Sequence, residues 1–305
     1  MSRTSQEIAA LAMELPAVER EHGVVSDLVE LTKARLNFYV IITTFVGFCM
    51  AAGAGLDWLR LFNAVLGTTL AAFGAAALNQ VLESKVDRLM ERTKNRPIPS
   101  GRMRLLHALL IGLGMSIFGC GYLWLTTNLL SAALAASTVV IYVLIYTPMK
   151  RKTSFCTVVG AVSGAIPPVI GWTAVEPQIG LGAWVLFGIL FTWQMPHFLA
   201  IAWMYRDEYA QAGFVMLKRD DRTGSSTAIQ SLLYTLALLA VSLIPVFTGT
   251  HNWVYLVAAL VLNGGMLACA VEFLTERTRN SARRLFFASI IFLPVLLGFM
   301  VFTKL

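Results

Sequence analysis

The chain has 305 residues, of which 57% are hydrophobic and only 13% are charged. Soluble globular domains carry about 25% charged residues, so the composition excludes a soluble domain and indicates a protein embedded in a membrane. The net charge of +7 is informative through its distribution along the chain, and nothing in that distribution calls for a nucleic-acid partner.

Nine apolar runs are long enough to cross a bilayer, which takes about 20 helical residues each. These runs cover residues 36–54, 61–82, 105–126, 128–147, 154–175, 180–204, 228–248, 253–274 and 285–303. No long polar linker separates any of them from the rest. The sequence therefore predicts an all-α fold, a polytopic membrane bundle of nine transmembrane helices. Residues 1–30 are expected to form an N-terminal arm, and residues 31–305 a single membrane domain.

Lysine and arginine occupy every second connection between these runs. Of the 24 such residues, all but Arg60 and Lys304 lie before the first run or in 83–104, 150–152, 206–222 and 277–284. The positive-inside rule then places these connections and the N-terminus in the cytoplasm. The first 30 residues are rich in Asp and Glu and lack an apolar core, unlike a transit or signal peptide. We therefore expect a multi-pass protein of a bacterial inner membrane, in contact with the lipid bilayer.

An oxygen-rich motif follows the second run. Asn79, Glu83 and Asp87 are four residues apart each time, so they share one helical face if the helix continues through Asp87. Mg²⁺ prefers oxygen ligands and is often held by one or two carboxylates together with substrate phosphate oxygens. The sequence therefore predicts a magnesium site at this membrane boundary.

Cations surround this motif and match phosphate chemistry, because arginine pairs with phosphate oxygens two at a time and lysine adds a point charge. In residues 79–104 they are Lys85, Arg88, Arg92, Lys94, Arg96, Arg102 and Arg104. The positive-inside rule alone would also produce a basic loop here. It would not place Glu83 and Asp87 at the end of an apolar helix, where a carboxylate needs a partner. The block is therefore interpreted as a diphosphate site.

Two further segments carry candidate phosphate ligands. Lys33 stands at the entry to the first run and could reach a phosphate, although cations there also serve as membrane anchors. The fourth run ends in a small cluster that is a second candidate for the diphosphate: Tyr146, Lys150, Arg151 and Thr153. The fifth run, GAVSGAIPPVIGW, is rich in Gly and Pro and is expected inside the bundle, because small residues allow helices to approach closely.

The sixth run contains a second polar group. Gln194 and His197 are one helical turn apart, and Glu208 falls near the same face if the helix runs straight, with Asp207 pointing elsewhere. Polar side chains within a span are costly without partners. They either form a binding site or make hydrogen bonds between helices, and their spacing leaves both open. The last three runs have few polar residues and are interpreted as scaffold.

Several motifs together resemble those of the protoheme IX farnesyltransferases, the heme O synthases among the UbiA-type intramembrane prenyltransferases. The first is the run from Asn79 to Pro97, with Glu83, Asp87, Arg92 and Arg96 at the matching positions. The stretches YTPMKRKT, GAVSGAIPPVIGW, WQMPHF and DEYAQAGFVML follow in the same order. The likeness extends from about Lys33 to Leu217.

This resemblance implies a nine-helix bundle whose central cavity opens to the cytoplasmic side. It implies that Asn79, Glu83 and Asp87 hold Mg²⁺ on farnesyl diphosphate and, with Arg92 and Lys150, form the catalytic set. The implied diphosphate ligands are Lys33, Arg92, Lys94, Arg96, Lys150 and Arg151. The implied heme ligands are Trp193, Gln194, His197, Asp207 and Glu208.

The resemblance also implies a reaction, the transfer of a farnesyl group to a vinyl group of heme B with addition of water, giving heme O and diphosphate. A heme A synthase downstream is then a candidate protein partner. The chain lacks the second Asp-rich motif of general UbiA-type enzymes and has Tyr205, Arg206, Asp207 and Glu208 there. A prenyltransferase for another acceptor, such as a quinone precursor, and a small-molecule transporter are the competing interpretations.

Overall fold

The computed structural model describes residues 23–53, 55–218 and 220–305, and the rest of the predicted N-terminal arm, residues 1–22, lies outside them. Nine helical segments in this part are long and apolar enough to span a membrane, which confirms the predicted number. The helices are α2 Val24–Leu31, α3 Ala34–Ala51, α4 Trp58–Asp87, α5 Leu105–Thr126, α6 Leu129–Val140, η1 Ile141–Tyr146, α7 Thr147–Met149, α8 Cys156–Ala165, α9 Pro167–Thr173, α10 Leu181–Met204, α11 Arg206–Gln211, α12 Ser225–Phe247, α13 Trp253–Glu276 and α14 Arg279–Phe302.

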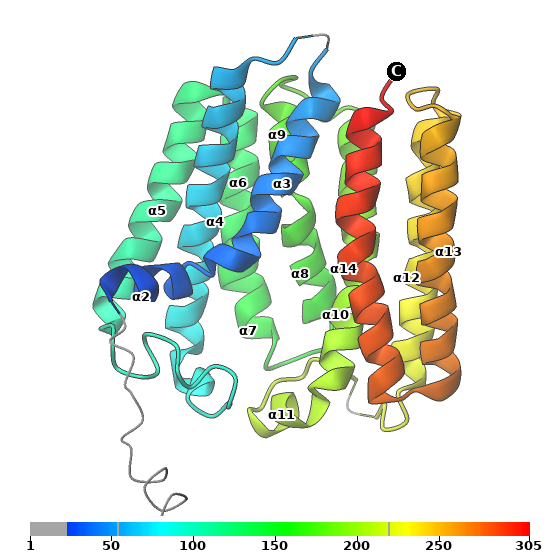
Figure 1. Ribbon diagram of the computed structural model, residues 1–305. Helices are drawn as coiled ribbons and strands as arrows, with labels where there is room; N and C mark the ends of the chain where they lie inside the picture. The colour runs from blue at the N-terminus through cyan, green and yellow to red at the C-terminus, as the bar shows by residue number, and fades with distance from the viewer. Residues whose placement is uncertain (1–22, 54, 219) are drawn as a thin grey trace, which may run out of the picture.

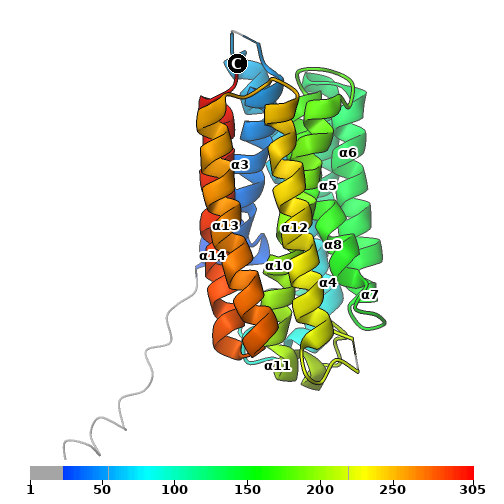
Figure 2. The same ribbon diagram turned by 90° about the vertical axis from the view of Figure 1, so that its right-hand side faces the viewer.

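The spans stand side by side in one bundle, and the short α2 lies across them near one end (Figures 1 and 2). The loop after α4, the short helix α7 and the short helix α11 are all at this same end, while the C-terminus is at the other (Figure 1). The fourth span combines α6, η1 and α7, and the fifth combines α8 and α9. The polar ends of several spans are thereby brought to one end of the bundle.

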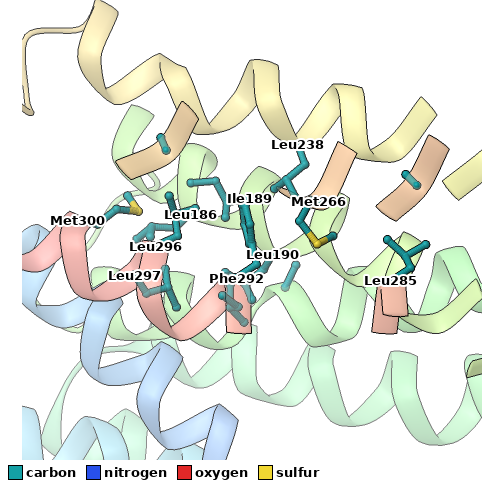
Figure 3. Packing of buried hydrophobic residues seen from close by; sticks show 14 of the residues in the cluster. Leu186, Ile189, Leu190, Leu238, Met266, Leu285, Phe292, Leu296, Leu297 and Met300 are labelled. Carbon is teal, nitrogen blue, oxygen red and sulfur yellow. The ribbon is translucent and has the colours of Figure 1, made fainter. Parts of the chain in front are cut away.

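The largest apolar core joins α10 to the last three spans. Leu186 and Ile189 of α10 meet Leu238 of α12, Met266 of α13 and Phe292 of α14 (Figure 3). Only 28–39% of the apolar window in each of the last three spans is buried, so most of their surface faces outward, as lipid-facing scaffold helices require. The fifth span is 72% buried over the same window length, which confirms that it lies inside the bundle.

Close contact between α3 and α9 fixes the position of the first span. A side chain on Gly47 would overlap the carbonyl of Pro168, and one on Gly171 would overlap the carbonyl of Thr44. Small residues at such crossings let helix backbones approach closely, which is how membrane helices gain packing energy. At the far end, Lys304 Nζ donates to the carbonyl of Ala52 at 2.6 Å, which links the ends of the first and last spans.

The helix α4 is longer than its apolar run. Asp57 caps its start by accepting a hydrogen bond from Arg60 N at 2.9 Å, and the helix continues through Asp87. The predicted end at residue 82 came from hydropathy, which falls as soon as polar side chains enter the sequence. The helix nevertheless continues for more than one further turn, through buried polar residues such as Glu83 and Asp87.

Candidate active site

The three oxygen-bearing side chains of α4 lie on one buried face at the α11 end of the bundle. Asn79 is 0% exposed, Glu83 6% and Asp87 2%. Because α4 stays helical through Asp87, the four-residue spacing places all three on one side. None of them faces lipid, so the geometric condition of the magnesium-site hypothesis is met.

Each of these side chains is hydrogen-bonded to a cation from a different part of the chain. Lys33 Nζ donates to Asn79 Oδ1 at 2.7 Å. Lys150 Nζ is 2.8 Å from Glu83 Oε1, and Arg96 Nη1 is 2.8 Å from Asp87 Oδ2. Buried carboxylates require such partners, since an unpaired buried charge is strongly destabilising. Three sequence-distant cations are therefore gathered around one row of oxygen atoms.

The loop between α4 and α5 is held in place by its own polar contacts. Thr93, 2% exposed, donates to the carbonyl of Asp87 at 3.0 Å. Arg102 binds Asp27 at 2.8 Å and Glu30 at 2.7 Å, both on α2. Arg102 thus joins the loop to α2 and is not free for phosphate, contrary to its inclusion among the phosphate-binding cations of the loop.

A widened turn in the fourth span brings in residues that sequence reasoning missed. The segment Ile141–Tyr146 is a π-helix, a distortion that is frequent at functional sites. Pro148 has no N–H to donate to the preceding turn, and Thr147 Oγ1 donates to the carbonyl of Tyr142 at 2.8 Å. Asn79 Nδ2 in turn donates to Thr147 Oγ1 at 3.0 Å. The proline in YTPMKRKT was the available signal for this distortion.

Glu83, Asp87 and the three cations line a cavity of about 230 Å³, which we call the polar pocket, whereas Asn79 and Thr147 are not part of its lining. Its charged lining consists of Lys33, Glu83, Asp87, Arg92, Arg96 and Lys150. Four cations against two carboxylates leave an excess of positive charge, which suits a multiply charged anion. The rest of the lining includes Tyr142, Tyr146, Phe198 and Phe214.

The two lysines of the polar pocket differ in how firmly they keep their protons. Burial lowers the pKa of Lys33, because desolvation disfavours the charged ammonium. Burial also acts to lower the pKa of Lys150, but Tyr146 and the Glu83 carboxylate raise it by more, so the net change is upward. Lys150 therefore holds its proton more firmly than an ordinary lysine, whereas Lys33 loses its charge more readily.

A second cavity of about 210 Å³, which we call the apolar chamber, continues from the polar pocket into the bundle. The two share Lys33, Leu36, Tyr142 and Phe198 in their linings. Four alanines of α4 form part of the wall of the apolar chamber, which extends to Thr68 and Ile170. The site thus joins a cationic, oxygen-rich end to a mostly apolar interior.

Two of the predicted phosphate ligands are not in the lining of the polar pocket. Lys94 is 45% exposed and pairs with Glu91 at 2.5 Å. Arg151 is exposed beside the half-buried Lys150. Arg92 does line the pocket, and its Nη2 donates to the hydroxyl of Tyr209 at 3.3 Å.

The residues predicted to hold heme are not brought together. The sixth span ends at Met204 and a separate helix, α11, begins at Arg206, so the straight helix needed to align Glu208 with His197 does not exist. Trp193 Nε1 donates to the carbonyl of Ser289, and His197 Nδ1 is 2.7 Å from the hydroxyl of the same residue. Both contacts lie between α10 and α14.

The remaining members of that set point to other places. Gln194 lines the apolar chamber, where its Nε2 donates to the carbonyl of Leu190 at 3.0 Å. Glu208 Oε1 accepts a hydrogen bond from Arg92 N at 3.4 Å. The side chain of Asp207 is 87% exposed. The break at Tyr205 explains why Asp207 and Glu208 leave the face of His197, because it changes the direction of the chain.

Glu83 and Asp87 are the side chains of the polar pocket that could ligate a divalent cation, with the Asn79 carbonyl oxygen on the same face. Among the described residues, no group of three or more His, Cys, Asp or Glu side chains forms a metal site. Two carboxylates fit a hard ion that takes its other ligands from substrate oxygens and water. They do not form a closed site made of protein alone.

Comparison with known proteins agrees with this architecture. The model of the UbiA prenyltransferase family matches residues 40–293. A protoheme IX farnesyltransferase of Solibacter usitatus (strain Ellin6076) is 43% identical over 287 residues, covering 91% of this chain and 98% of the relative. One of Opitutus terrae (strain DSM 11246 / JCM 15787 / PB90-1) is 44% identical over 281 residues, covering 92% and 95%.

Solved structures share the fold at low sequence identity. A digeranylgeranylglyceryl phosphate synthase structure aligns with a TM-score of 0.77 at 14% identity, covering 92% of this chain and 98% of that one. A UbiA homolog from Archaeoglobus fulgidus, bound to DMAPP and Mg²⁺, aligns at 0.63 and 11% identity, covering 90% and 99%. The family match covers most of the spans and the whole polar row on α4, and the chain therefore belongs to the UbiA prenyltransferase family.

Proposed function

We propose that the chain transfers the farnesyl group of farnesyl diphosphate to a vinyl group of heme B, with addition of water, giving heme O and diphosphate. One observation carries the proposal: a polar pocket with excess positive charge adjoins an apolar chamber and shares four lining residues with it. Such a pair of cavities suits a diphosphate joined to an apolar tail. The heme acceptor is supported by the names of the relatives, protoheme IX farnesyltransferases that are 37–44% identical.

The diphosphate is held by the cations of the polar pocket. In this proposal Lys33, Arg96 and Lys150 bind phosphate oxygens, and Arg92 adds a further guanidinium at the edge of the same pocket. Charge-assisted hydrogen bonds of this kind are about twice as strong as neutral ones. They bind the leaving group most tightly as negative charge builds up on it, which lowers the barrier to ionisation.

The carboxylates of the pocket are assigned to Mg²⁺. Glu83 and Asp87 would hold the ion, with the Asn79 oxygen beside them, and substrate oxygens would complete its ligands. When bound, the ion supplies charge neutralisation for the departing diphosphate. With Glu83 and Asp87 holding the ion, Lys150 and Arg96 would be available to pair with phosphate oxygens.

The apolar chamber is assigned to the farnesyl tail. Thr68, at its inner end, precedes Asn79 by eleven residues on α4, which is about 16 Å of helix rise. The wall residues exclude water, so the allylic cation is not captured before the acceptor attacks. The faces of Tyr142 and Phe198 stand where the two cavities meet and can stabilise positive charge.

The test is an assay of the purified protein with labelled farnesyl diphosphate, heme B and Mg²⁺. We expect a farnesylated heme whose formation stops when the metal is chelated and resumes when Mg²⁺ is restored. Parallel reactions with a quinone precursor in place of heme B separate this function from that of a prenyltransferase for another acceptor. Release of labelled diphosphate without any farnesylated product would remove the heme assignment.

The membrane and its orientation are part of the proposal. The α11 end of the bundle carries the basic connections and is assigned to the cytoplasmic face of a bacterial inner membrane by the positive-inside rule. The N-terminus and the opening of the polar pocket are then cytoplasmic. The product would remain membrane-bound, where a downstream heme A synthase is the proposed recipient.

A further inference from the structure

A third cavity lies beside the polar pocket at the α11 end of the bundle, and we call it the outer cavity. Its volume is about 570 Å³, within the range of about 300–1,000 Å³ that is typical of small-molecule sites. Trp203, Tyr209 and Phe214 contribute aromatic side chains to its lining, and Met216 and Leu217 add apolar surface. A wide apolar molecule would be held there by its faces.

The outer cavity and the polar pocket are neighbours, because Ala202, Tyr209, Phe214 and Met216 line both. Tyr209 and Phe214 meet edge to face with centroids 6.1 Å apart. On the polar-pocket side, Lys150 Nζ is 5.8 Å from the centre of the Phe214 ring. These two rings are therefore the partition between the proposed diphosphate site and the outer cavity.

Three basic residues line the outer cavity but not the polar pocket, and we call them its cationic side. The Arg206 guanidinium lies 4.2 Å from the centre of the Trp203 ring, and Lys218 and Arg222 complete the basic lining. Neither Lys218 nor Arg222 makes an ion pair within the described residues.

Two acids also line the outer cavity, and neither cancels these cations. Asp221 caps α12, accepting from Thr227 N at 2.8 Å and from Ser226 N at 3.1 Å, so its charge is directed at a helix N-terminus. Asp207 is 87% exposed and only 3.6 Å from Arg206, a solvent-screened contact of little strength. The cationic side therefore remains available to an anionic group.

Resting on the proposed function, we propose that the outer cavity binds the heme acceptor, with Arg206, Lys218 and Arg222 pairing its two propionates. In heme B the vinyl groups and the propionates are on opposite edges of the ring. Propionates at the cationic side thus direct the vinyl edge toward the Tyr209–Phe214 partition and the diphosphate beyond it. The macrocycle then contacts the aromatic and apolar lining of the outer cavity, with its vinyl edge at the Tyr209–Phe214 partition.

This assignment places the acceptor apart from His197. The His197 ring is stacked between Trp193 and Phe286, with centroid distances of 5.1 and 4.9 Å, and is absent from the linings of the polar pocket and the outer cavity. Recognition by the outer cavity comes from carboxylate charge and ring faces and needs no iron ligand from His197.

The experiment compares heme B with its dimethyl ester, in which both propionates are neutral. Binding of each to the purified full chain is followed by absorbance, and KM is measured for heme B and for farnesyl diphosphate. We expect the wild type to bind heme B more tightly than the ester by about ten-fold or more, the effect of losing one charge-assisted hydrogen bond or more. The triple variant R206Q/K218Q/R222Q should lose this difference and keep its KM for farnesyl diphosphate.

Two further variants serve as controls for the triple variant. Arg206→Lys keeps the charge and should recover part of the preference for the acid. Arg283→Gln removes an arginine that also lies on an aromatic ring, 5.4 Å from the centre of Phe287, but outside the outer cavity, and should change nothing.

Equal binding of acid and ester by the wild type, or an unchanged preference in the triple variant, would overturn the inference even if heme B is farnesylated. The binding measurement does not require the protein to catalyse the reaction. A wild type that prefers the acid but makes no product would therefore leave the inference standing and remove the proposed reaction.

Discussion

At the residue scale, the polar pocket depends on matching each buried oxygen of α4 with one cation. The three cations come from the entry to α3, from the loop after α4 and from the loop after α7. Removing one member leaves its partner buried and unpaired, which costs more than the pair itself contributes. Substitutions here are therefore expected to lower stability as well as binding of the charged substrate.

Asp87→Asn is expected to lower prenyl transfer by about 100-fold or more, the usual cost of removing one preorganised electrostatic group. The amide keeps the shape of the side chain but loses the charge assigned to the metal. Glu91→Gln is the matched control, because Glu91 lies in the same loop with its side chain 84% exposed. Both variants are assayed with labelled farnesyl diphosphate after their insertion in membranes is confirmed, and normal turnover by Asp87→Asn would contradict the assigned role.

Lys33→Arg is expected to change the pH dependence of the reaction. Burial lowers the pKa of Lys33, so the ammonium loses its proton at a lower pH than an ordinary lysine. Because kcat/KM reports ionisations of the free enzyme, its value for farnesyl diphosphate should fall as the pH rises through that pKa. Arginine keeps its charge, so the fall should move to higher pH in the variant. An alkaline limb that does not move would assign the ionisation to another group.

At the element scale, two irregular helices shape the site. The π-helix η1 carries Tyr142 and Tyr146 into the polar pocket, and the break at Tyr205 turns α11 across its edge. The break also creates the outer cavity, since α11 and the segment after it form its walls. A regular helix through either region would present different side chains to the substrate.

The helix α4 also sets the depth of the apolar chamber, which gives a prediction about tail length. Ala72 lines the apolar chamber and precedes Asn79 by seven residues, about 10 Å of helix rise. Ala72→Phe should block the inner part of the chamber, so KM should rise for farnesyl diphosphate more than for geranyl diphosphate, by about ten-fold in their ratio. Ala133→Phe, at an exposed position of α6 outside the chamber, is the control. An equal effect on both substrates would place the tail elsewhere.

At the scale of the whole molecule, charge and cavities are concentrated at one end of the bundle. The loop after α4, the loop after α7 and α11 meet there, and the C-terminus is at the other end (Figure 1). The last three spans contribute a large apolar core and a lipid-facing surface. They hold α10 in place and supply no side chain to the polar pocket.

The concentration of basic connections at one end of the bundle predicts the outcome of a labelling experiment on intact cells. Glu91→Cys, at the α11 end, should resist a membrane-impermeant thiol reagent until the cells are opened. Thr248→Cys, at the end of α12 near the opposite side, should be labelled at once. The parent chain, with free Cys49, Cys120, Cys156 and Cys269, gives the background. Labelling in the reverse order would refute the assigned orientation.

The sequence by itself determined the class of protein, the nine spans and the row of Asn79, Glu83 and Asp87. These features depend on hydropathy, on the spacing of residues along one helix and on the family motifs around that row. All three are local properties that the chain carries before it folds.

Only the tertiary structure decided which cations reach the row and how the cavities are arranged. Lys33 and Arg96 enter the polar pocket, whereas Lys94 turns outward and Arg102 binds α2. The positions of these four cations in the sequence do not distinguish the ones that enter the pocket from the ones that do not. Their contacts depend on how segments distant in sequence pack together. The separation of His197 from Glu208 has the same cause. Packing sets the direction of the chain after Met204, and a helical pattern extended past the break does not predict that direction.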